Sequence, residues 1–398
     1  MEAVNLSSDT VDDMRREIIE PSETSKLVTG LSHPVWVYRY SSPSRGWVLS
    51  IATQAEPGSQ KLSLGGFRIA PEIRTSTPNY NNDAEAVGLA EGMGRKVAWS
   101  KLIRAGGPLG LESLDRIVGG KCVLFPTPVF QIGQAGDFEL LDFAIQSLKD
   151  CNEHAGILIN TGQDMGHGVL SDQATDTLTY LNRHFPGSIL SDTSKPTAEG
   201  NFYALRGMLA GLGISLGSAR VGLIGAGNIG LHIYDRLRDQ DTEVAVVELA
   251  DTTRRRLKEE GVRTWRPEDK LEFLKNPMHA VVVNASGGTL DRATIDAIVK
   301  NGSIKVVCGC ENLVMPDPSG VEMLREHGIL FAPTEFCGMM GYLTAVEEYL
   351  SYLNQREFAI DVMFDAAPKL EEAGQRAAKY AAVSYTHLRA HETNFDLV

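Results

Sequence analysis

A glycine-rich turn in the second half of the chain carries the clearest chemical signal. The run Gly225-Ala226-Gly227-Asn228-Ile229-Gly230 follows the apolar residues 221–224 and opens a helical pattern. In that setting the first glycine makes a tight turn, the second lets the backbone approach a pyrophosphate, and the third lets helix and strand pack closely. Glu248 ends the next apolar run, where a carboxylate accepts hydrogen bonds from an adenosine ribose and repels a 2′-phosphate. The pattern predicts a dinucleotide site that takes NAD rather than NADP.

Two alternatives stay open in this region. Arg254-Arg255-Arg256 follow Glu248, and arginines at such a strand end can hold the 2′-phosphate of NADP. A charge run at this place is more often a solvated helix face. The glycine run could also be a tight turn without a ligand, but the strand, helix and acid around it favour the dinucleotide interpretation.

Three polar side chains in the first half of the chain stand near glycines or strand ends. Lys121 follows Gly119-Gly120 and begins an apolar run, where burial would lower its pKa towards that of a usable general base. Asp164 follows a short predicted strand, at a loop position suited to proton transfer. Lys96 lies within a helical pattern, where it could bind a carboxylate. Taken singly, residues of these types are more often a strand-edge lysine, a turn aspartate and an exposed lysine.

Alternating strands and helices are predicted to position these groups. Short strands are predicted at residues 34–40, 46–53, 121–125, 156–160, 221–224, 243–248, 280–283, 304–308 and 330–331. Helices are predicted at residues 83–103, 197–212, 231–239, 341–355 and 358–380, with a basic helix that ends at residue 260. The first two strands flank a Pro/Ser loop and predict a hairpin. The alternation after residue 197 is typical of a parallel sheet wound with helices, and thus of an α/β protein.

Length and composition limit the classes of function. A chain of 398 residues predicts two or three domains at roughly 150 residues each, and two is the preferred number. The net charge of −13 argues against a nucleic-acid partner and against an anionic membrane surface. No apolar run is long enough for a membrane span, and the polar N-terminus does not resemble a signal peptide. Five cysteines without a paired C-x-x-C pattern predict reduced thiols in a cytoplasmic protein, and no metal site is expected.

Seven elements, taken in order between residues 34 and 352, resemble the glutamate/leucine/phenylalanine/valine dehydrogenase superfamily, and most of all its leucine and phenylalanine branch. The matching elements are Leu64-Gly65-Gly66-Phe67-Arg68 (L-G-G-x-R), Glu85 to Lys96 (E-A-x-x-L-A-x-G-M-x-x-K), Gly119-Gly120-Lys121 (G-G-K), Asp164-Met165-Gly166 (D-V-G), Thr197 to Met208 (T-A-x-G…R-G-M), Gly309-Cys310-Glu311-Asn312 (A-G-x-A-N-N) and Ala332-Pro333 to Glu348 (A-P…G-G…E). Together these elements are far more specific than any one of them.

The resemblance implies a two-domain organisation. Residues 1–196 would form a substrate-binding and dimerisation domain, and residues 197–341 a Rossmann-type NAD-binding domain, with the active site in the cleft between them. The helices within residues 342–383 would pack back on the first domain. The tail 384–398 does not continue the Ala-rich helical pattern before it, and we expect it to be non-native.

The resemblance also implies a reaction and its residues. An L-amino acid would be oxidised at its CH–NH2 group by NAD to a 2-oxo acid and ammonia, reversibly, in a homo-oligomer. Lys121 and Asp164 would be catalytic, and Lys96 would bind the substrate carboxylate. The remaining residues would be Gly65 and Gly66 in the carboxylate pocket, and Thr197, Ser286 and Asn312 on the nicotinamide side.

Several departures from the superfamily pattern leave rival functions open. Residues 106–116 are an extra stretch, and Met339, Met340 and Tyr342 replace small residues that shape the side-chain pocket. One rival is a dehydrogenase of an unusual amino acid in secondary metabolism. The other is a non-catalytic NAD-binding homologue, against which the presence of Lys96, Lys121 and Asp164 argues.

Overall fold

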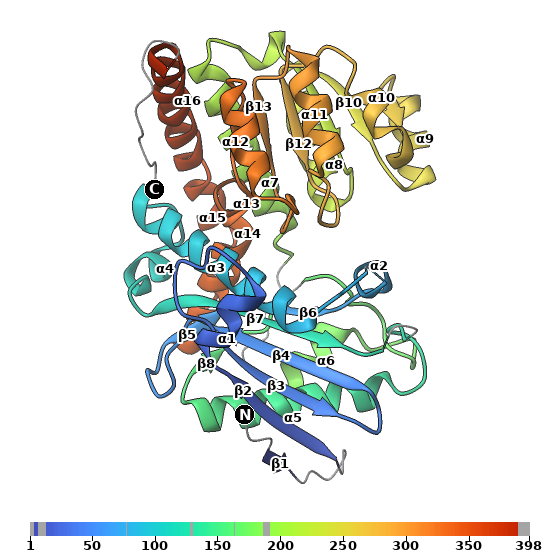
Figure 1. Ribbon diagram of the computed structural model, residues 1–398, viewed down its shortest axis with the longest axis vertical. Coiled ribbons are helices and arrows are strands. Elements are labelled where there is room, and N and C mark those ends of the chain that lie inside the picture. The colour runs from blue at the N-terminus through green and yellow to red at the C-terminus, as the bar shows by residue number, and fades with distance from the viewer. Residues whose placement is uncertain are drawn as a thin grey trace. The chain divides into compact units, whose positions relative to one another are not determined.

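The chain folds into two compact α/β units, which confirms the predicted fold class (Figure 1). The computed structural model describes residues 4–6, 13–76, 78–127, 130–162, 164–185 and 192–388. Unit 1 comprises Met1–Lys101, Gly107–Asp192 and Tyr342–Ala359, and unit 2 comprises Leu102–Gly106, Thr193–Gly341 and Ile360–Val398.

Unit 1 contains a mixed sheet in the order β1-β2-β3-β4-β7-β5-β8, in which β6 also pairs with β7. Its strands are β1 (Val4–Leu6), β2 (Met14–Ile19), β3 (Trp36–Ser42), β4 (Trp47–Thr53), β5 (Leu62–Leu64), β6 (Phe67–Ile69), β7 (Ile117–Phe125) and β8 (Leu158–Ile159). Its helices are α1 (Pro21–Leu27), α2 (Glu72–Thr75), α3 (Asn82–Ile103), α4 (Pro108–Ser113), α5 (Asp137–Ala155), α6 (Thr177–His184) and most of α14 (Met339–Leu353). The predicted hairpin is present as β3 and β4.

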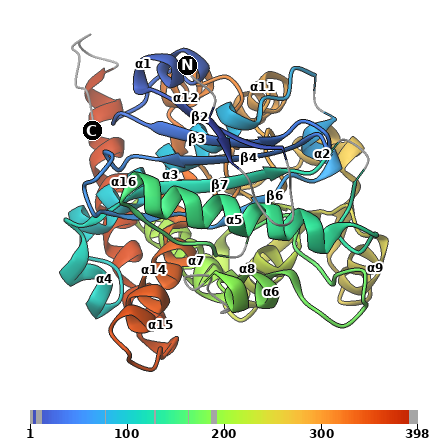
Figure 2. The same cartoon turned by 90° about the horizontal axis from the view of Figure 1, so that it is seen from below.

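Two helices cover opposite faces of this sheet. Helix α5 runs along one face (Figure 2), where its Leu141 and Leu148 share a buried cluster with Leu124 of β7. Helix α3 covers the other face, where its Val87 packs with Val123. Neighbouring residues of a strand point to opposite faces, so Lys121 projects on the same side as Val123, towards α3.

A break between two short strands places a glycine pair next to β7. β5 pairs with residues 117–119 of β7, and β6 pairs with residues 122–124 in the same register, so Gly65 and Gly66 lie opposite Gly120 and Lys121. A Cβ at Gly65 would lie 1.5 Å from the carbonyl oxygen of Gly120, and Gly66 has a φ of +84°. Only glycines allow this close approach and this backbone conformation.

Unit 2 contains a sheet of six strands among the residues described, all parallel, in the order β11-β10-β9-β12-β13-β14. Its strands are β9 (Arg220–Ile224), β10 (Glu243–Val247), β11 (Arg263–Trp265), β12 (Ala280–Val283), β13 (Val306–Gly309) and β14 (Leu330–Phe331). Its helices are α7 (Ser194–Gly211), η1 (Leu216–Ser218), α8 (Asn228–Arg238), α9 (Asp251–Glu259), η2 (Pro267–Asp269), α10 (Lys270–Phe273), α11 (Arg292–Asn301), α12 (Ser319–Glu326), α13 (Thr334–Cys337), α15 (Asp361–Ala366) and α16 (Lys369–Leu388).

The strand order of this sheet is that of doubly wound folds, which bind ligands at the carboxyl ends of their strands. Helices α11 and α12 cover one face of the sheet, where Ile298 and Leu324 pack with Val281 and Val307. Helices α7 and α8 pack against the sheet from the other side (Figure 1).

The C-terminal helices divide between the units, which differs from the expectation that residues 342–383 return to the first domain. Helix α16 packs on α7 within unit 2. A Cβ at Gly207 would lie 2.1 Å from the carbonyl oxygen of Glu371, so this glycine lets the two helices approach closely. The predicted helix 358–380 is interrupted at Pro368, and α16 continues to Leu388, past the change in sequence pattern at residue 384.

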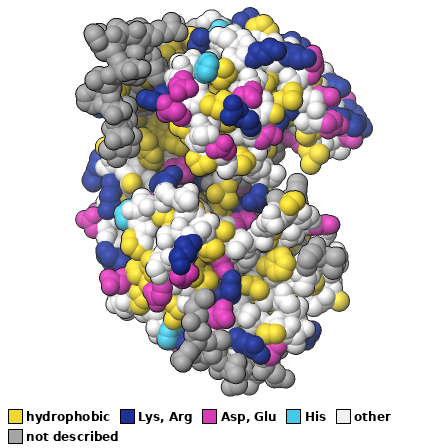
Figure 3. Space-filling view, viewed as in Figure 1, with side chains coloured by type: hydrophobic (Ala, Val, Ile, Leu, Met, Phe, Trp, Pro, Cys, Tyr) yellow, Lys and Arg dark blue, Asp and Glu magenta, His cyan; other side chains and the backbone are white. Residues whose placement is uncertain are grey.

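The surface charges, the helix lengths and the cysteines can be described in the structure. On the face drawn in Figure 3, Lys and Arg side chains lie among Asp and Glu side chains and form no single basic area. None of the described helices is both long enough and apolar enough to span a bilayer. None of the five cysteines, all within the described residues, forms a disulfide.

Candidate active site

Lys121 and Asp164 form a buried ion pair in unit 1. Lys121 lies on β7 and Asp164 on the loop after β8. The Lys121 Nζ also donates a hydrogen bond to the carbonyl oxygen of Gly65 at 2.7 Å, and it would lie 3.5 Å from a Cβ at Gly66. The Lys121 and Asp164 side chains are 4% and 11% exposed. These contacts bring together four of the residues expected at the substrate site, namely Lys121, Asp164, Gly65 and Gly66.

Arg68 and Glu85, which the sequence reasoning did not place in the site, complete this cluster. Arg68 donates to both carboxylate oxygens of Asp164, from Nε and from one terminal nitrogen, each at 3.2 Å. Its other terminal nitrogen donates to Glu85 at 2.5 Å. A signal for Arg68 was present in the sequence, because an arginine between Phe67 and Ile69 in a buried strand needs a buried charged partner.

Lys96 lies on α3, the helix that covers the face from which Lys121 projects. It follows Glu85 by about three helical turns on the same stripe of α3. Met93, one turn before Lys96, lies close to Gly65, since its Cγ would be 3.1 Å from a Cβ at Gly65. Lys96 is 5% exposed, as Lys121 is. Both lysines therefore belong to the interior of unit 1, on the same side of its sheet.

The cluster sets the ionisation of Lys121 and Asp164. Burial alone would raise the pKa of the Asp164 carboxyl, but the positive charges of Lys121 and Arg68 outweigh it and hold that pKa well below its usual range. Burial has the largest effect on the pKa of the Lys121 amine and lowers it. Asp164 raises this pKa and Arg68 lowers it, and the pKa ends below its ordinary value. The arrangement keeps Asp164 ionised and makes Lys121 give up its proton more readily than an exposed lysine.

The glycine turn in unit 2 has the geometry that the motif predicts. Gly225 has a φ of +94° and comes directly after β9. A Cβ at Gly230 would lie 2.2 Å from the carbonyl oxygen of Gly225, so helix α8 packs closely on the turn. A Cβ at Gly227 would meet nothing within 4 Å, and Asn228 and Ile229 begin α8 just beyond it. The open side of Gly227 and the free amides of the helix N-terminus suit a phosphate group.

Glu248 lies at the carboxyl edge of the sheet of unit 2, beside the glycine turn. It follows β10, and its carboxylate accepts hydrogen bonds from the amides of Ala226 at 2.5 Å and Ala250 at 2.7 Å. Arg254 is buried and donates to the carbonyl oxygens of Glu248 and Leu249. Arg256 pairs with Glu260. These contacts occupy two of the three arginines that could have held a 2′-phosphate.

Thr197, Ser286 and Asn312 lie in unit 2. Ser286 follows β12 and Asn312 follows β13, at the carboxyl edge of the sheet. The Thr197 hydroxyl, in the first turn of α7, donates a hydrogen bond to the carbonyl oxygen of Thr193 just before the helix. The carbonyl oxygen of Thr197 lies 3.9 Å from the sulfur of Cys310 at the end of β13, which places Thr197 at the same edge.

Glu311 ties two of these loops together and was not among the expected site residues. Its buried carboxylate accepts hydrogen bonds from the amides of Ala285 at 3.0 Å and Thr289 at 2.9 Å, and from the Thr289 hydroxyl at 2.7 Å. Burial raises the pKa of Glu311 although these bonds oppose it. The superfamily pattern has Ala at this position, so sequence resemblance alone could not signal the role of Glu311.

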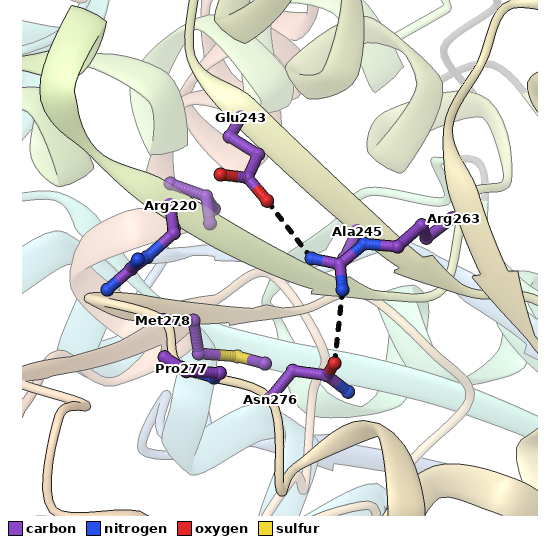
Figure 4. A pocket seen from close by; sticks show the side chains of 8 residues that line it. Arg220, Glu243, Ala245, Arg263, Asn276, Pro277 and Met278 are labelled. Carbon is purple, nitrogen blue, oxygen red and sulfur yellow. Dashed lines mark hydrogen bonds and ion pairs between the residues drawn. The ribbon is translucent and has the colours of Figure 1, made fainter.

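A small hollow at the other edge of the same sheet is no candidate for the cofactor site (Figure 4). Arg220, Glu243 and Arg263 surround it at the amino ends of β9, β10 and β11. Arg263 is already paired with Glu243 at 3.0 Å and with Asn276 at 3.2 Å. The hollow has room for about one water molecule.

Comparison with curated proteins finds amino-acid dehydrogenases. The chain is 25% identical over 308 residues to the leucine dehydrogenase of Geobacillus stearothermophilus, which covers 75% of this chain and 76% of the relative. It is 27% identical over 292 residues to the valine dehydrogenase of Streptomyces albus, covering 72% of each chain. No protein-family model matches the chain.

Solved structures of two-domain amino-acid dehydrogenases share the fold. L-Tryptophan dehydrogenase from Nostoc punctiforme aligns with a TM-score of 0.57 at 18% identity, over 87% of this chain and 95% of that one. A hetero-hexameric glutamate dehydrogenase from Thermus thermophilus, in a leucine-bound form, aligns with a TM-score of 0.60 at 16% identity, over 84% and 80%. The sequence relatives and the shared fold together support the superfamily of glutamate, leucine, phenylalanine and valine dehydrogenases, which the motifs of this chain indicate.

Proposed function

We propose that the protein catalyses the NAD-dependent oxidative deamination of an L-amino acid with an apolar side chain, such as leucine, valine or phenylalanine, and the reverse reductive amination. In the forward direction the α-carbon loses a hydride and the amino nitrogen loses a proton. Water then adds to the resulting imino acid, and ammonia leaves to give the 2-oxo acid. A bound nicotinamide dinucleotide supplies the hydride acceptor.

The buried pair of Lys121 and Asp164 is the observation that carries this proposal. A lysine whose pKa is lowered can accept a proton from the attacking water, and the Gly65 carbonyl orients its Nζ. Asp164 can exchange protons with the substrate nitrogen. Lys96 would bind the substrate carboxylate, and Gly65 and Gly66 would leave room for it.

The residues of unit 2 fit a nicotinamide dinucleotide. The amides at Gly227, Asn228 and Ile229 would hold the pyrophosphate, since Gly227 is exposed and open on its outer side. Glu248 would bind the adenosine ribose, and its charge supports NAD over NADP. The nicotinamide end would lie along Thr197, Ser286 and Asn312. On this proposal unit 2 is a Rossmann-type cofactor domain, unit 1 binds substrate, and the protein forms a homo-oligomer.

A substrate panel tests the proposal. The purified protein is mixed with NAD and each of the twenty common L-amino acids, and NADH absorbance is followed. NADH formation with apolar amino acids supports the proposal. Cofactor binding with no turnover on any amino acid would instead show a non-catalytic NAD-binding protein.

A second candidate function is the oxidation of a less common amino acid with a polar or aromatic side chain. The hydroxyl of Tyr342 is buried and has no hydrogen-bond partner among the described residues. Tyr342 stands at a position that shapes the side-chain pocket in the superfamily, and a buried unpaired hydroxyl favours a ligand that bonds to it. The test compares kcat/KM for apolar substrates with kcat/KM for hydroxyl-bearing substrates. A higher ratio of the first to the second in Tyr342→Phe than in the wild type would support this candidate.

A further inference from the structure

We propose that Arg68 is a positioning residue of the dehydrogenase reaction, which holds the Asp164 carboxylate against Lys121 and supplies a permanent positive charge beside this pair. The inference rests on the function proposed above for Lys121 and Asp164. It assigns a task to a side chain that would not itself touch the substrate.

The contacts of Asp164 leave its carboxylate fully occupied. One oxygen accepts from Arg68 at 3.2 Å and from the amide of Met165 at 2.7 Å. The other accepts from Arg68 at 3.2 Å and contacts Lys121. A carboxylate has about four lone-pair directions, and all four are used here. Asp164 can therefore meet a substrate nitrogen only if one of these contacts opens. Because Arg68 binds both oxygens, the carboxylate stays in place when a single contact such as that of Lys121 opens.

Glu85 binds the terminal nitrogen of Arg68 that does not contact Asp164. It accepts from Arg68 at 2.5 Å, and its second oxygen faces Arg74 of α2 at 3.6 Å. Arg68 and Glu85 are 3% and 5% exposed. The planar guanidinium is thus clamped between two carboxylates from different elements, and a lysine at this position could not reach all three oxygens.

The charge of Arg68 acts on both partners in the same direction. It holds down the pKa of Asp164 together with Lys121, and it lowers the pKa of Lys121. A guanidinium does not lose its proton in a protein. When Lys121 becomes neutral to act as a base, Arg68 still compensates Asp164, so the two groups do not have to change charge together.

Other charged or titratable groups face this cluster from several elements. They are Arg74 of α2, Tyr80 just before α3, Glu85 in the first turn of α3, Cys122 of β7 and His167 of the loop after Asp164. Lys96 lies further along α3. Burial lowers the pKa of the His167 imidazole from its usual value, so its titration has to be told apart from that of Lys121.

Three variants of the full-length protein separate the effect of the two Arg68 hydrogen bonds to Asp164 from the effect of the Arg68 charge. Arg68→Lys keeps the charge and loses the two-nitrogen grip. Arg68→Met combined with Glu85→Gln removes both charges, so that no carboxylate is left buried alone. Glu85→Gln alone keeps Arg68 and removes only its counter-charge. For each variant, kcat and KM are measured as a function of pH with NAD and the most active amino acid of the panel. A His167→Gln variant shows which part of the pH dependence comes from titration of the His167 imidazole.

The expected results differ between the variants. Arg68→Lys should lose roughly ten- to hundredfold in kcat with the KM for NAD unchanged, because Asp164 is held less firmly. In the double variant the rise of activity with pH should move to higher pH by about one unit. In Glu85→Gln alone the rise should stay or move to lower pH. Full kcat in Arg68→Lys, or an unmoved rise in the double variant, overturns the inference.

A direct titration keeps the inference separate from the proposed function. In protein labelled with 13C at lysine Cε, the signal absent from Lys121→Met reports the ionisation of Lys121 without any turnover. Its midpoint should move to higher pH in the double variant even if no amino acid is oxidised. A midpoint that does not move contradicts the role of Arg68, whereas a moved midpoint in an inactive protein contradicts only the dehydrogenase proposal.

Discussion

The Glu311 carboxylate accepts a hydrogen bond from the backbone nitrogen of Thr289 at 2.9 Å, and so joins the end of β13 to the loop that carries Ser286. Glu311→Ala leaves the Thr289 and Ala285 amides without this acceptor, and the loop should loosen. We expect the Kd for NAD to rise about tenfold, which corresponds to ~1.4 kcal/mol, with a smaller change in kcat. Fluorescence titration measures it. Glu322→Ala, an exposed glutamate on α12, is the control, and an unchanged Kd in Glu311→Ala would contradict the role of the loop.

Two glycines of the same turn should respond differently to alanine. At Gly227 a methyl group meets no protein atom, so the free energy of unfolding should change by less than about 0.5 kcal/mol while NAD binding is lost. At Gly230 the methyl group meets the carbonyl oxygen of Gly225, so stability should fall by about 1–3 kcal/mol. Denaturant unfolding and NAD titration of both variants separate the effects. Normal NAD binding by Gly227→Ala would show that no phosphate lies there.

The charge of Glu248 should decide the choice of cofactor. Glu248→Ser removes the carboxylate that would repel a 2′-phosphate, and Glu248→Gln removes only the charge while keeping an oxygen for the Ala226 amide. We expect the ratio of kcat/KM for NAD over NADP to fall about tenfold in both variants. Glu243→Ser, at the far end of the same strand, is the control. An unaltered ratio would mean that Glu248 does not face the ribose.

Asp164 should couple the stability of unit 1 to pH. Asp164→Asn leaves Lys121 and Arg68 buried without their carboxylate, which costs about 3–5 kcal/mol at neutral pH. The folded-state pKa of Asp164 lies below its ordinary value of 3.8, so its stabilisation is present above that pH and is lost as the pH falls through the folded-state pKa. The stability difference between wild type and variant should therefore shrink below pH ~4.

Urea unfolding at several pH values measures this difference. Asp115→Asn, which changes an exposed aspartate, should leave stability nearly unaltered at every pH. If the wild type and Asp164→Asn differ by the same amount at neutral and acidic pH, the ion pair does not contribute as described.

Local signals in the sequence were sufficient for much of the fold. The apolar runs at β9 and β12 predict these strands within a residue, because buried parallel strands are short and continuously apolar. The strand β11 was missed, since Arg263–Trp265 is a partly exposed edge strand without such a run. Helix α16 was assigned to the wrong neighbour, because its contact with α7 depends on Gly207, a long-range feature that helical periodicity does not contain.

The candidate site was predictable only in part, for a similar reason. Lys121, Asp164 and the glycine pair come from recognisable motifs, and the structure brings them together. The contact between Arg68 and Asp164 joins residues 96 positions apart, so no local pattern reports it. The same holds for Glu311 and the loop after β12, where this chain also departs from the pattern of its superfamily.

The central claim is that Lys121 carries out the chemistry of amino-acid oxidation. Wild type and Lys121→Ala are assayed side by side for NADH formation from NAD with the most active amino acid, and their Kd values for NAD are measured in parallel. Lys101→Ala, an exposed lysine of α3, is the control. The account predicts that Lys121→Ala loses at least about a thousandfold in kcat while its Kd for NAD stays within about twofold. Turnover near that of the wild type in Lys121→Ala would contradict it.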